Sequence, residues 1–138
     1  MYHYVRPIKN SDYPNIKGLE LEGFRRQLDY LMQHYTPVTS EDVLNWAELQ
    51  KPLPEKACYL TFDDGYKDHI DYVLPALKER GLHGAFFPPE NAIFRRKMLD
   101  VNKIHYILAS ARTPQTLAGD LDDLLKQQGM AATDLKGY

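Results

Sequence analysis

The chain has 138 residues, of which 43% are hydrophobic, and this is enough for a single domain with a buried core. The same composition excludes an intrinsically disordered segment. The formal net charge of −2 gives no electrostatic reason to expect nucleic acid or an anionic membrane surface as a partner.

The cysteine content and the N-terminal residues indicate the cellular compartment in which the protein is expected. Cys58 is the single cysteine and lies in an apolar run, so it forms no internal disulfide and suits a reducing compartment. The first residues lack the basic and then apolar regions of a secretory signal. No stretch is long and apolar enough to span a bilayer. We therefore expect a protein without a membrane span that is cytoplasmic, the alternative being one whose secretory signal has been removed.

The first part of the chain predicts two short strands and two helices. Residues 1–5 have the pattern of a strand, and residues 6–20 are rich in loop-forming residues. Apolar residues at helical spacing predict a helix from about Leu21 to His34. A short strand is expected over residues 36–39. Ser40 is then expected to cap a second helix that runs to about residue 49.

A central strand follows, and the rest of the chain is expected to be arranged around it. The apolar, aromatic-rich run over residues 57–62 predicts a buried strand that ends at Asp63, Asp64 and Gly65. Strands that are buried on both faces belong mostly to parallel sheets. In α/β folds, the loops that leave the carboxyl ends of such strands carry the chemistry. We therefore expect the two aspartates at an active face.

A helix and a second core strand are expected after this loop. Apolar residues from Ile70 to Leu77 mark the helix, which should be kinked or broken at Pro75 and should end at Gly81. His69 is expected at its start, on the surface. A strand over residues 83–87 follows, and the order strand, helix, strand implies a right-handed parallel crossover.

Two more helices are expected in the last third of the chain. Before them, the basic residues Arg95, Arg96 and Lys97 are interpreted as a solvated face, although arginine also suits an acidic sugar or a phosphate. In one helix, residues 101, 104, 105 and 108 should share one face. The last helix should begin at Thr113-Pro114 and end at Gly129, and residues 130–138 show no clear pattern.

The adjacent carboxylates Asp63 and Asp64 carry the chemical argument. Two neighbouring carboxylates repel each other unless a cation or a shared proton relieves the repulsion. One interpretation is a metal-bound carboxylate beside a second carboxylate that acts as a base. The other interpretation is an Asp-Asp-Gly turn on a surface loop, because both residue types favour turns. The residue chemistry alone leaves both interpretations open.

The segment Thr61–Tyr66 resembles the first signature of the polysaccharide deacetylases, carbohydrate esterase family 4. Residues 1–5, 73–81 and 85–87 resemble the family's opening strand and the helix and strand after the signature, so the similarity covers about residues 1 to 90. It implies an α/β fold that is the first part of a distorted (β/α) barrel. It also implies metal-dependent removal of an acetyl group from an N-acetylated sugar, an acetylated carbohydrate as the partner, and zinc, or alternatively cobalt or nickel, as the cofactor.

The resemblance assigns roles to residues of the signature and exposes one departure from the family. It makes Asp63 the general base and Asp64 a metal ligand. The family adds two histidines in a His-Ser/Thr-x-x-His motif, and this sequence lacks that pair. His105 is the remaining candidate ligand, with Val101 in the position four residues before it. Its alternative role is a packed histidine on an apolar helix face.

Three further residues are candidates for the same site. Asn102 shares a helix face with His105, although an amide is a poor zinc ligand. His3 is a candidate for lining the same cavity, and Tyr66 for stacking on a sugar ring or packing in the interior. Both are therefore predicted substrate-binding residues.

The family's later signatures, an arginine and a general-acid histidine, have no match after residue 110. We therefore expect residues 1–138 to form a single domain that is the N-terminal part of a longer deacetylase domain, and not to be a competent deacetylase alone. The alternatives are a non-catalytic or truncated deacetylase-like carbohydrate-binding module, and phosphoryl transfer on an aspartate. Phosphoryl transfer commonly uses Asp-x-Asp, whereas the aspartates here are adjacent.

Overall fold

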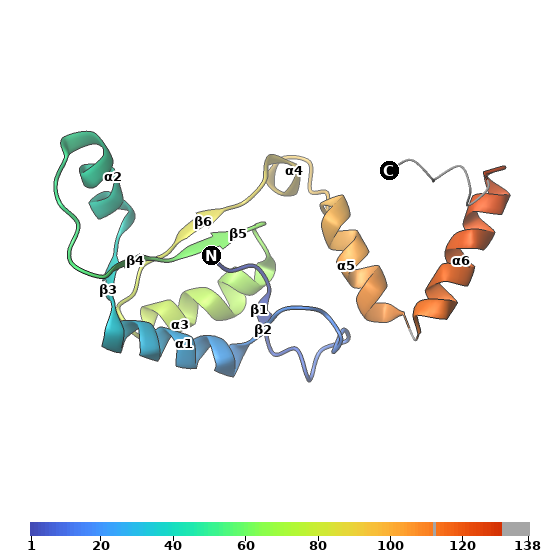
Figure 1. Ribbon diagram of the computed structural model, residues 1–138, viewed down its shortest axis with the longest axis horizontal. Helices are drawn as coiled ribbons and strands as arrows, with labels where there is room; N and C mark the ends of the chain where they lie inside the picture. Colours follow the sequence, from blue (N-terminus) through green and yellow to red (C-terminus); the bar gives the residue numbers. More distant parts are fainter. Residues whose placement is uncertain (112, 131–138) are drawn as a thin grey trace.

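The computed structural model describes residues 1–111 and 113–130, and it contains short strands and longer helices (Figure 1). The strands are β1 (Val5–Arg6), β2 (Leu19–Glu20), β3 (Thr36–Val38), β4 (Ala57–Tyr59), β5 (Thr61–Asp63) and β6 (Ala85–Phe87). The α-helices are α1 (Leu21–His34), α2 (Ser40–Leu49), α3 (Leu74–Lys78), α4 (Glu90–Ile93), α5 (Asp100–Ser110) and α6 (Pro114–Gln127), and a π-helical turn (His69–Val73) precedes α3.

The strands form three parallel pairs, β1 with β2, β3 with β4 and β5 with β6. Tyr2 forms an isolated bridge to Phe62, which brings the first residues of the chain against β5. The predicted strand over residues 57–62 is interrupted at Leu60 and continues as β4 and β5. The α/β class is therefore confirmed, but the described residues form strand pairs and not a barrel.

The main core lies between α1, the helix after β5, and strands β1 and β5. Its fully buried side chains are Phe24 and Leu28 of α1, Phe62 of β5, and Val5, Val73 and Leu77. Fully burying one such side chain stabilises the fold by about 1.5–3 kcal/mol. The predicted bounds of α1 are confirmed, because its apolar residues recur at the spacing of one helix face.

The helix after the signature loop is broken in the way that its proline predicts. Pro75 has no N–H group, so the hydrogen bonds of a regular helix stop before it. The chain forms a π-helical turn whose last N–H, on Leu74, donates to the carbonyl of His69. It then continues as α3 and ends near Gly81, whose φ is +64°. Ile70 was expected on the buried face, but it is 70% exposed.

The cap of α2 differs from the prediction by one residue. Thr39, and not Ser40, is the N-cap: its hydroxyl accepts a hydrogen bond from the N–H of Asp42. The Asp42 carboxylate accepts a hydrogen bond from the Thr39 N–H in return, at 2.8 Å, so the two residues form a capping box. The side chain of Ser40 contacts Tyr59 on β4 instead.

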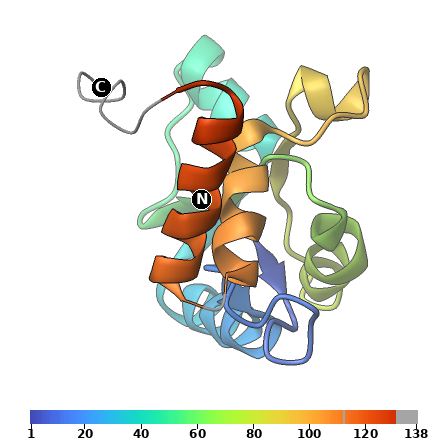
Figure 2. The same cartoon turned by 90° about the vertical axis from the view of Figure 1, so that its right-hand side faces the viewer.

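Helices α5 and α6 lie side by side at one end of the molecule (Figures 1 and 2). The face of α5 that Val101, Ile104, His105 and Leu108 share is exposed, so His105 is not a packed core histidine. Asn102 and Ala109 are buried instead, and Tyr106 packs against a second cluster around Tyr4, Ile8 and Ile16. In the described residues, no helix combines the length and the apolar character that crossing a membrane requires.

Candidate functional site

The predicted active loop leaves the carboxyl end of β5, beside its parallel partner β6. Asp63 ends β5 opposite Phe87, and Asp64 and Gly65 follow with φ values of +71° and +62°. A Cβ atom on Gly65 would lie 2.6 Å from Cβ of Pro88, which follows Phe87. Only glycine tolerates both the positive φ and this close approach. The two aspartates are therefore held at the carboxyl end of β5, beside the carboxyl end of β6.

Asp64 is engaged by Tyr66 two residues later. The Tyr66 hydroxyl lies 2.6 Å from Oδ2 of Asp64 and 2.9 Å from Oδ1 of Asn102, on α5. Burial, followed by the hydrogen bond with Asp64, raises the pKa of Tyr66 above its usual value of 10.0. One face of the Tyr66 ring is stacked on Tyr4, with ring centroids 4.2 Å apart. The structure thus ties the signature loop to β1 and to α5.

Asp63 has a different neighbour. Nε2 of His3 lies 4.0 Å from Oδ2 of Asp63, and their side chains are 45% and 28% exposed. A proton acceptor and an imidazole are therefore side by side at the edge of the site. His3, predicted to line the cavity, is placed next to the predicted base, but its role toward a substrate stays a prediction.

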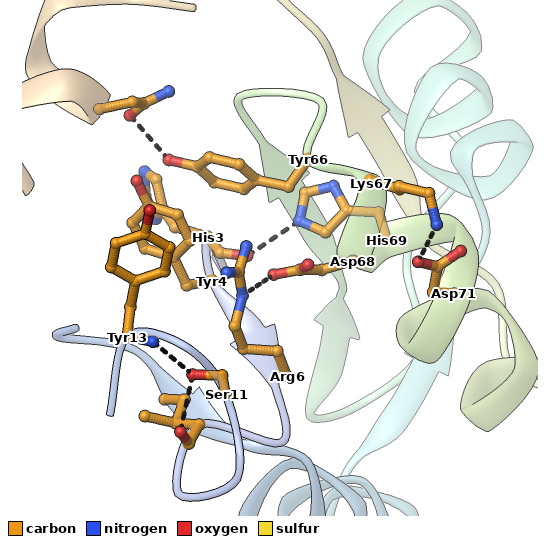
Figure 3. Close-up of polar contacts among 12 residues, drawn as sticks. His3, Tyr4, Arg6, Ser11, Tyr13, Tyr66, Lys67, Asp68, His69 and Asp71 are labelled. Carbon is orange, nitrogen blue, oxygen red and sulfur yellow. Dashed lines mark hydrogen bonds and ion pairs between the residues drawn. The ribbon is translucent and has the colours of Figure 1, made fainter. Parts of the chain in front are cut away.

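His69 was expected on the surface, but it is 3% exposed. Its ring packs edge-on against Phe62 and Tyr66. Nε2 lies 2.9 Å from the backbone carbonyl of His3 (Figure 3). Because a carbonyl only accepts, Nε2 carries the proton and donates it. His69 therefore fixes the backbone beside Asp63.

The sequence contained a signal for this burial. Tyr66, His69, Val73 and Leu77 are three or four residues apart, which is the spacing of one helix face. The prediction followed Ile70 instead, because isoleucine is more often buried than histidine. The hydrogen bond to the His3 carbonyl, 66 residues away in sequence, satisfies Nε2 of the buried imidazole, whereas Nδ1 is buried without a partner among the described residues.

Arg6 and Asp68 form a mostly buried ion pair under the signature loop. Nε of Arg6 donates to Oδ2 of Asp68 at 2.6 Å (Figure 3), and their side chains are 15% and 10% exposed. The guanidinium carbon of Arg6 also lies 5.4 Å from the Tyr4 ring centre and 5.9 Å from that of Tyr106. Although burial lowers the pKa of Arg6, the Asp68 carboxylate outweighs it and raises that pKa.

The residues near Asp64 do not complete a zinc site. A catalytic zinc site takes three protein ligands, usually His, Cys, Asp or Glu. In residues 1–111 and 113–130, no three of these residue types are close enough to hold an ion. His105 is exposed, and its Nδ1 lies 3.4 Å from the Tyr4 hydroxyl. The described residues do not fit a zinc ion by themselves, and the ligand roles of Asp64 and His105 stay predictions.

A pocket of about 770 Å³ opens beside the signature loop. It lies between the loop after β5 and the segment that joins α4 to α5, and it includes Asp64, Tyr66 and Asn102. This volume is in the range of ligand sites. The pocket brings the predicted metal ligand Asp64 and the predicted sugar-binding residue Tyr66 to one surface.

Comparisons with known proteins point to one family. The family model described as polysaccharide deacetylase matches residues 50–106. Two curated proteins, the poly-beta-1,6-N-acetyl-D-glucosamine N-deacetylases of Escherichia coli strain K12 and Escherichia coli O157:H7, are each 37% identical over 62 residues. These residues are 44% of this chain and 9% of each relative.

A solved structure of a de-N-acetylase from Aggregatibacter actinomycetemcomitans is similar to this chain, with a TM-score of 0.53 and 26% sequence identity. The match covers 63% of this chain and 35% of that one. This chain thus spans only a small part of the curated relatives and about a third of the solved structure. The matched region contains the whole signature loop. The signature and these similarities together support recognition of the chain as similar to the N-terminal portion of polysaccharide deacetylases.

Proposed function

We propose that the chain is part of a carbohydrate deacetylase, which removes the acetyl group from an N-acetylated sugar. One observation supports this above all: Asp63 and Asp64 are adjacent at the carboxyl end of β5, in the family signature. The relatives named for N-deacetylation of poly-beta-1,6-N-acetyl-D-glucosamine support the same class of substrate. In the whole domain, we propose that the described strand pairs are the first part of a distorted (β/α) barrel.

The proposed reaction is hydrolysis of an amide. A water molecule attacks the acetyl carbonyl carbon, the carbon–nitrogen bond breaks, and acetate and a sugar amine are formed. Asp63 acts as the general base that accepts the proton of the water. His3, 4.0 Å from Asp63, and Tyr66 in the adjacent pocket are positioned to contact the sugar.

Polysaccharide deacetylases generally depend on a metal, and we propose that Asp64 and His105 contribute to holding zinc, or alternatively cobalt or nickel. The described residues do not supply a complete set of ligands. We therefore expect the 138-residue chain alone to release no acetate from acetylated oligosaccharides. We also propose that the protein acts in the cytoplasm, which cell fractionation would test.

A second function is a non-catalytic module that binds an acetylated carbohydrate through the same pocket. It is favoured by the lack of a three-residue metal cluster in residues 1–111 and 113–130. It is also favoured by the Tyr66 hydroxyl, which already engages Oδ2 of Asp64. A binding module needs the pocket but not the base.

Replacing the proposed base Asp63 distinguishes the deacetylase from the carbohydrate-binding module. Asp63→Asn keeps the shape of the side chain and removes its ability to accept a proton. If the protein deacetylates, introducing this change into the gene in its native host should raise the acetyl content of a host carbohydrate. Asp12→Asn, in an exposed loop, is the matched control and should change nothing. An unchanged acetyl content in Asp63→Asn, with saccharide binding retained by the purified chain, would favour the binding module.

A further inference from the structure

The pocket beside the signature loop has an unusual charge for a chain with net charge −2. Four basic side chains and one acidic side chain line it. The basic residues are Arg6 from β1, Lys67 immediately after the signature loop, and Arg96 and Lys97 from the segment between α4 and α5. The acidic residue is Asp64. The pocket is therefore locally cationic, in contrast to the whole chain.

Two of these four cations already have carboxylate partners. Arg6 pairs with Asp68 at 2.6 Å, and Lys67 forms an ion pair with Asp71. Arg96 and Lys97 form no ion pair among the residues that the structure describes. Both residues line a pocket whose one carboxylate, Asp64, accepts a hydrogen bond from Tyr66. The pocket thus has an excess of positive charge that no side chain of its lining neutralises.

The backbone holds these two residues at the pocket. The N–H of Lys97 donates to the carbonyl of Asn91 at 3.0 Å, which ties the segment to α4. Arg96 has a φ of +50°, a left-handed conformation that non-glycine residues rarely adopt. The neighbouring Arg95 is oriented differently: it lies 3.9 Å from Glu90 and does not line the pocket. Of the two adjacent arginines, only Arg96 therefore lines the pocket.

We propose that this pocket binds an anionic group carried by the saccharide, either a carboxylate or a phosphate. Arg96 and Lys97 are the specificity-determining residues, because guanidinium and ammonium groups donate charge-assisted hydrogen bonds to such oxyanions. The tyrosines Tyr66 and Tyr106 and the amide of Asn102 provide contacts for the uncharged part of the sugar. The inference rests on the proposed function in one respect: it takes the occupant of the pocket to be the N-acetylated saccharide.

Equilibrium binding to the full 138-residue chain tests the charge preference directly. The probes are N-acetylglucosamine, N-acetylglucosamine 1-phosphate, a disaccharide of N-acetylglucosamine and glucuronate, the neutral disaccharide N,N′-diacetylchitobiose, and inorganic phosphate. We expect either the phosphate probes or the carboxylate probe to bind about tenfold more tightly than the neutral probe of the same size. A tenfold ratio is the effect expected of one charge-assisted hydrogen bond. The preference should weaken as salt is added. Comparing the two monosaccharides tests for a phosphate preference, and comparing the two disaccharides tests for a carboxylate preference.

Two variants and two matched controls assign the effect to the pocket. Arg96→Gln and Lys97→Gln should each remove most of the preference, about five- to tenfold, and leave binding of the neutral probes unchanged. Arg95→Gln, next in sequence but outside the pocket, and Lys103→Gln, paired with Asp100, should bind like the wild type. All four side chains lie outside the hydrophobic clusters, so the variants should keep their thermal midpoints.

Each outcome bears on one proposal. Equal affinity for neutral and charged probes, no binding of any probe, or equal losses in the control variants would overturn the anion site. If the phosphate or the carboxylate probes bind more tightly than the neutral probes but Asp63→Asn leaves acetylation in the host unchanged, the anion site stands and the deacetylase proposal fails. If acetylation in the host depends on Asp63 but the charge of the probe has no effect on binding, the deacetylase proposal stands and the anion site fails.

Discussion

The hydroxyl of Tyr66 lies 2.6 Å from the carboxylate of Asp64 and 2.9 Å from the side-chain oxygen of Asn102. A tyrosine hydroxyl has one proton and donates it to one acceptor at a time. The shorter distance and the charge of the carboxylate favour Asp64 as the acceptor. The signature loop is therefore held by an interaction that needs tyrosine in its neutral form.

This relationship predicts how Tyr66 titrates. Burial and then the Asp64 carboxylate raise its pKa above 10.0, so Asp64→Asn should lower that pKa while burial keeps it raised. Because the folded-state pKa exceeds the unfolded one, the stability from neutral Tyr66 is complete below pH 10.0 and is lost as the pH rises through the folded pKa. NMR of ¹³C-labelled tyrosine, with the signal assigned by its loss in Tyr66→Phe, measures this. An unchanged pKa in Asp64→Asn would show that the contact does not form in solution.

Asp63 and Asp64 should separate two functions in an intact enzyme of which this chain is the N-terminal part. Asp64→Ala should lower the content of bound divalent metal, because it removes a proposed ligand. Asp63→Asn should keep the metal and lose deacetylation, because it removes the proposed base. Elemental analysis and acetate release measure the two effects. Equal loss of metal in both variants would contradict the division of roles.

Gly65 should tolerate alanine less well than Gly81. Both have positive φ values, +62° and +64°, which cost alanine about 1–2 kcal/mol. A Cβ on Gly65 would also lie 2.6 Å from Cβ of Pro88, whereas nothing lies within 4 Å at Gly81. We expect Gly65→Ala to lower the free energy of unfolding by about 1–3 kcal/mol more than Gly81→Ala does. Urea denaturation measures the difference.

A double-mutant cycle shows whether the contact with Pro88 is the cause of that difference. Pro88→Gly removes the Cβ atom that the new methyl group would meet. Gly65→Ala should therefore cost less in the Pro88→Gly background than in the wild type. Additive effects would attribute the loss to backbone strain alone.

Removing the charge of only one partner of the Arg6–Asp68 ion pair should lower the free energy of unfolding. Their side chains are 15% and 10% exposed, so Asp68→Asn leaves the Arg6 charge without its partner in a mostly buried place. We expect a loss of about 3 kcal/mol in the free energy of unfolding. Replacing both residues, as Arg6→Met with Asp68→Leu, should restore part of that loss because no unpaired charge remains. A double variant as unstable as the sum of the single variants would contradict this.

The capping box of α2 should respond to acid. Hydrogen bonds from the backbone and side chain of Thr39 lower the pKa of Asp42 below 3.8. A depressed folded-state pKa means that this contribution to stability is present above pH 3.8 and is lost as the pH falls through the folded value. Thr39→Ala should speed hydrogen exchange of the first amides of α2 and destabilise the helix by about 1 kcal/mol. Ser40→Ala is the control and should leave these amides protected.

Local sequence patterns determined the elements whose stability comes from nearby residues. The bounds of α1 follow from the spacing of Phe24 and Leu28, and Thr113 and Pro114 begin α6 as predicted. The position of Asp63 and Asp64 at the end of a strand also follows from sequence, because an apolar run stops there. These features depend on periodicity, caps and turn chemistry, which act within a few residues.

Tertiary structure alone decided which faces are buried and which side chains meet. His69 is buried because the carbonyl of His3, 66 residues away, accepts a hydrogen bond from its ring. Helix α5 turns Asn102 and Ala109 inward, since the Tyr66 hydroxyl and the cluster around Tyr4 lie on that side. Its residues Val101, Ile104 and Leu108 are exposed instead. The cationic pocket likewise joins Arg6 to Arg96 and Lys97. No local pattern records these pairings, because the free energy of a buried polar group depends on partners that only the folded chain brings to it.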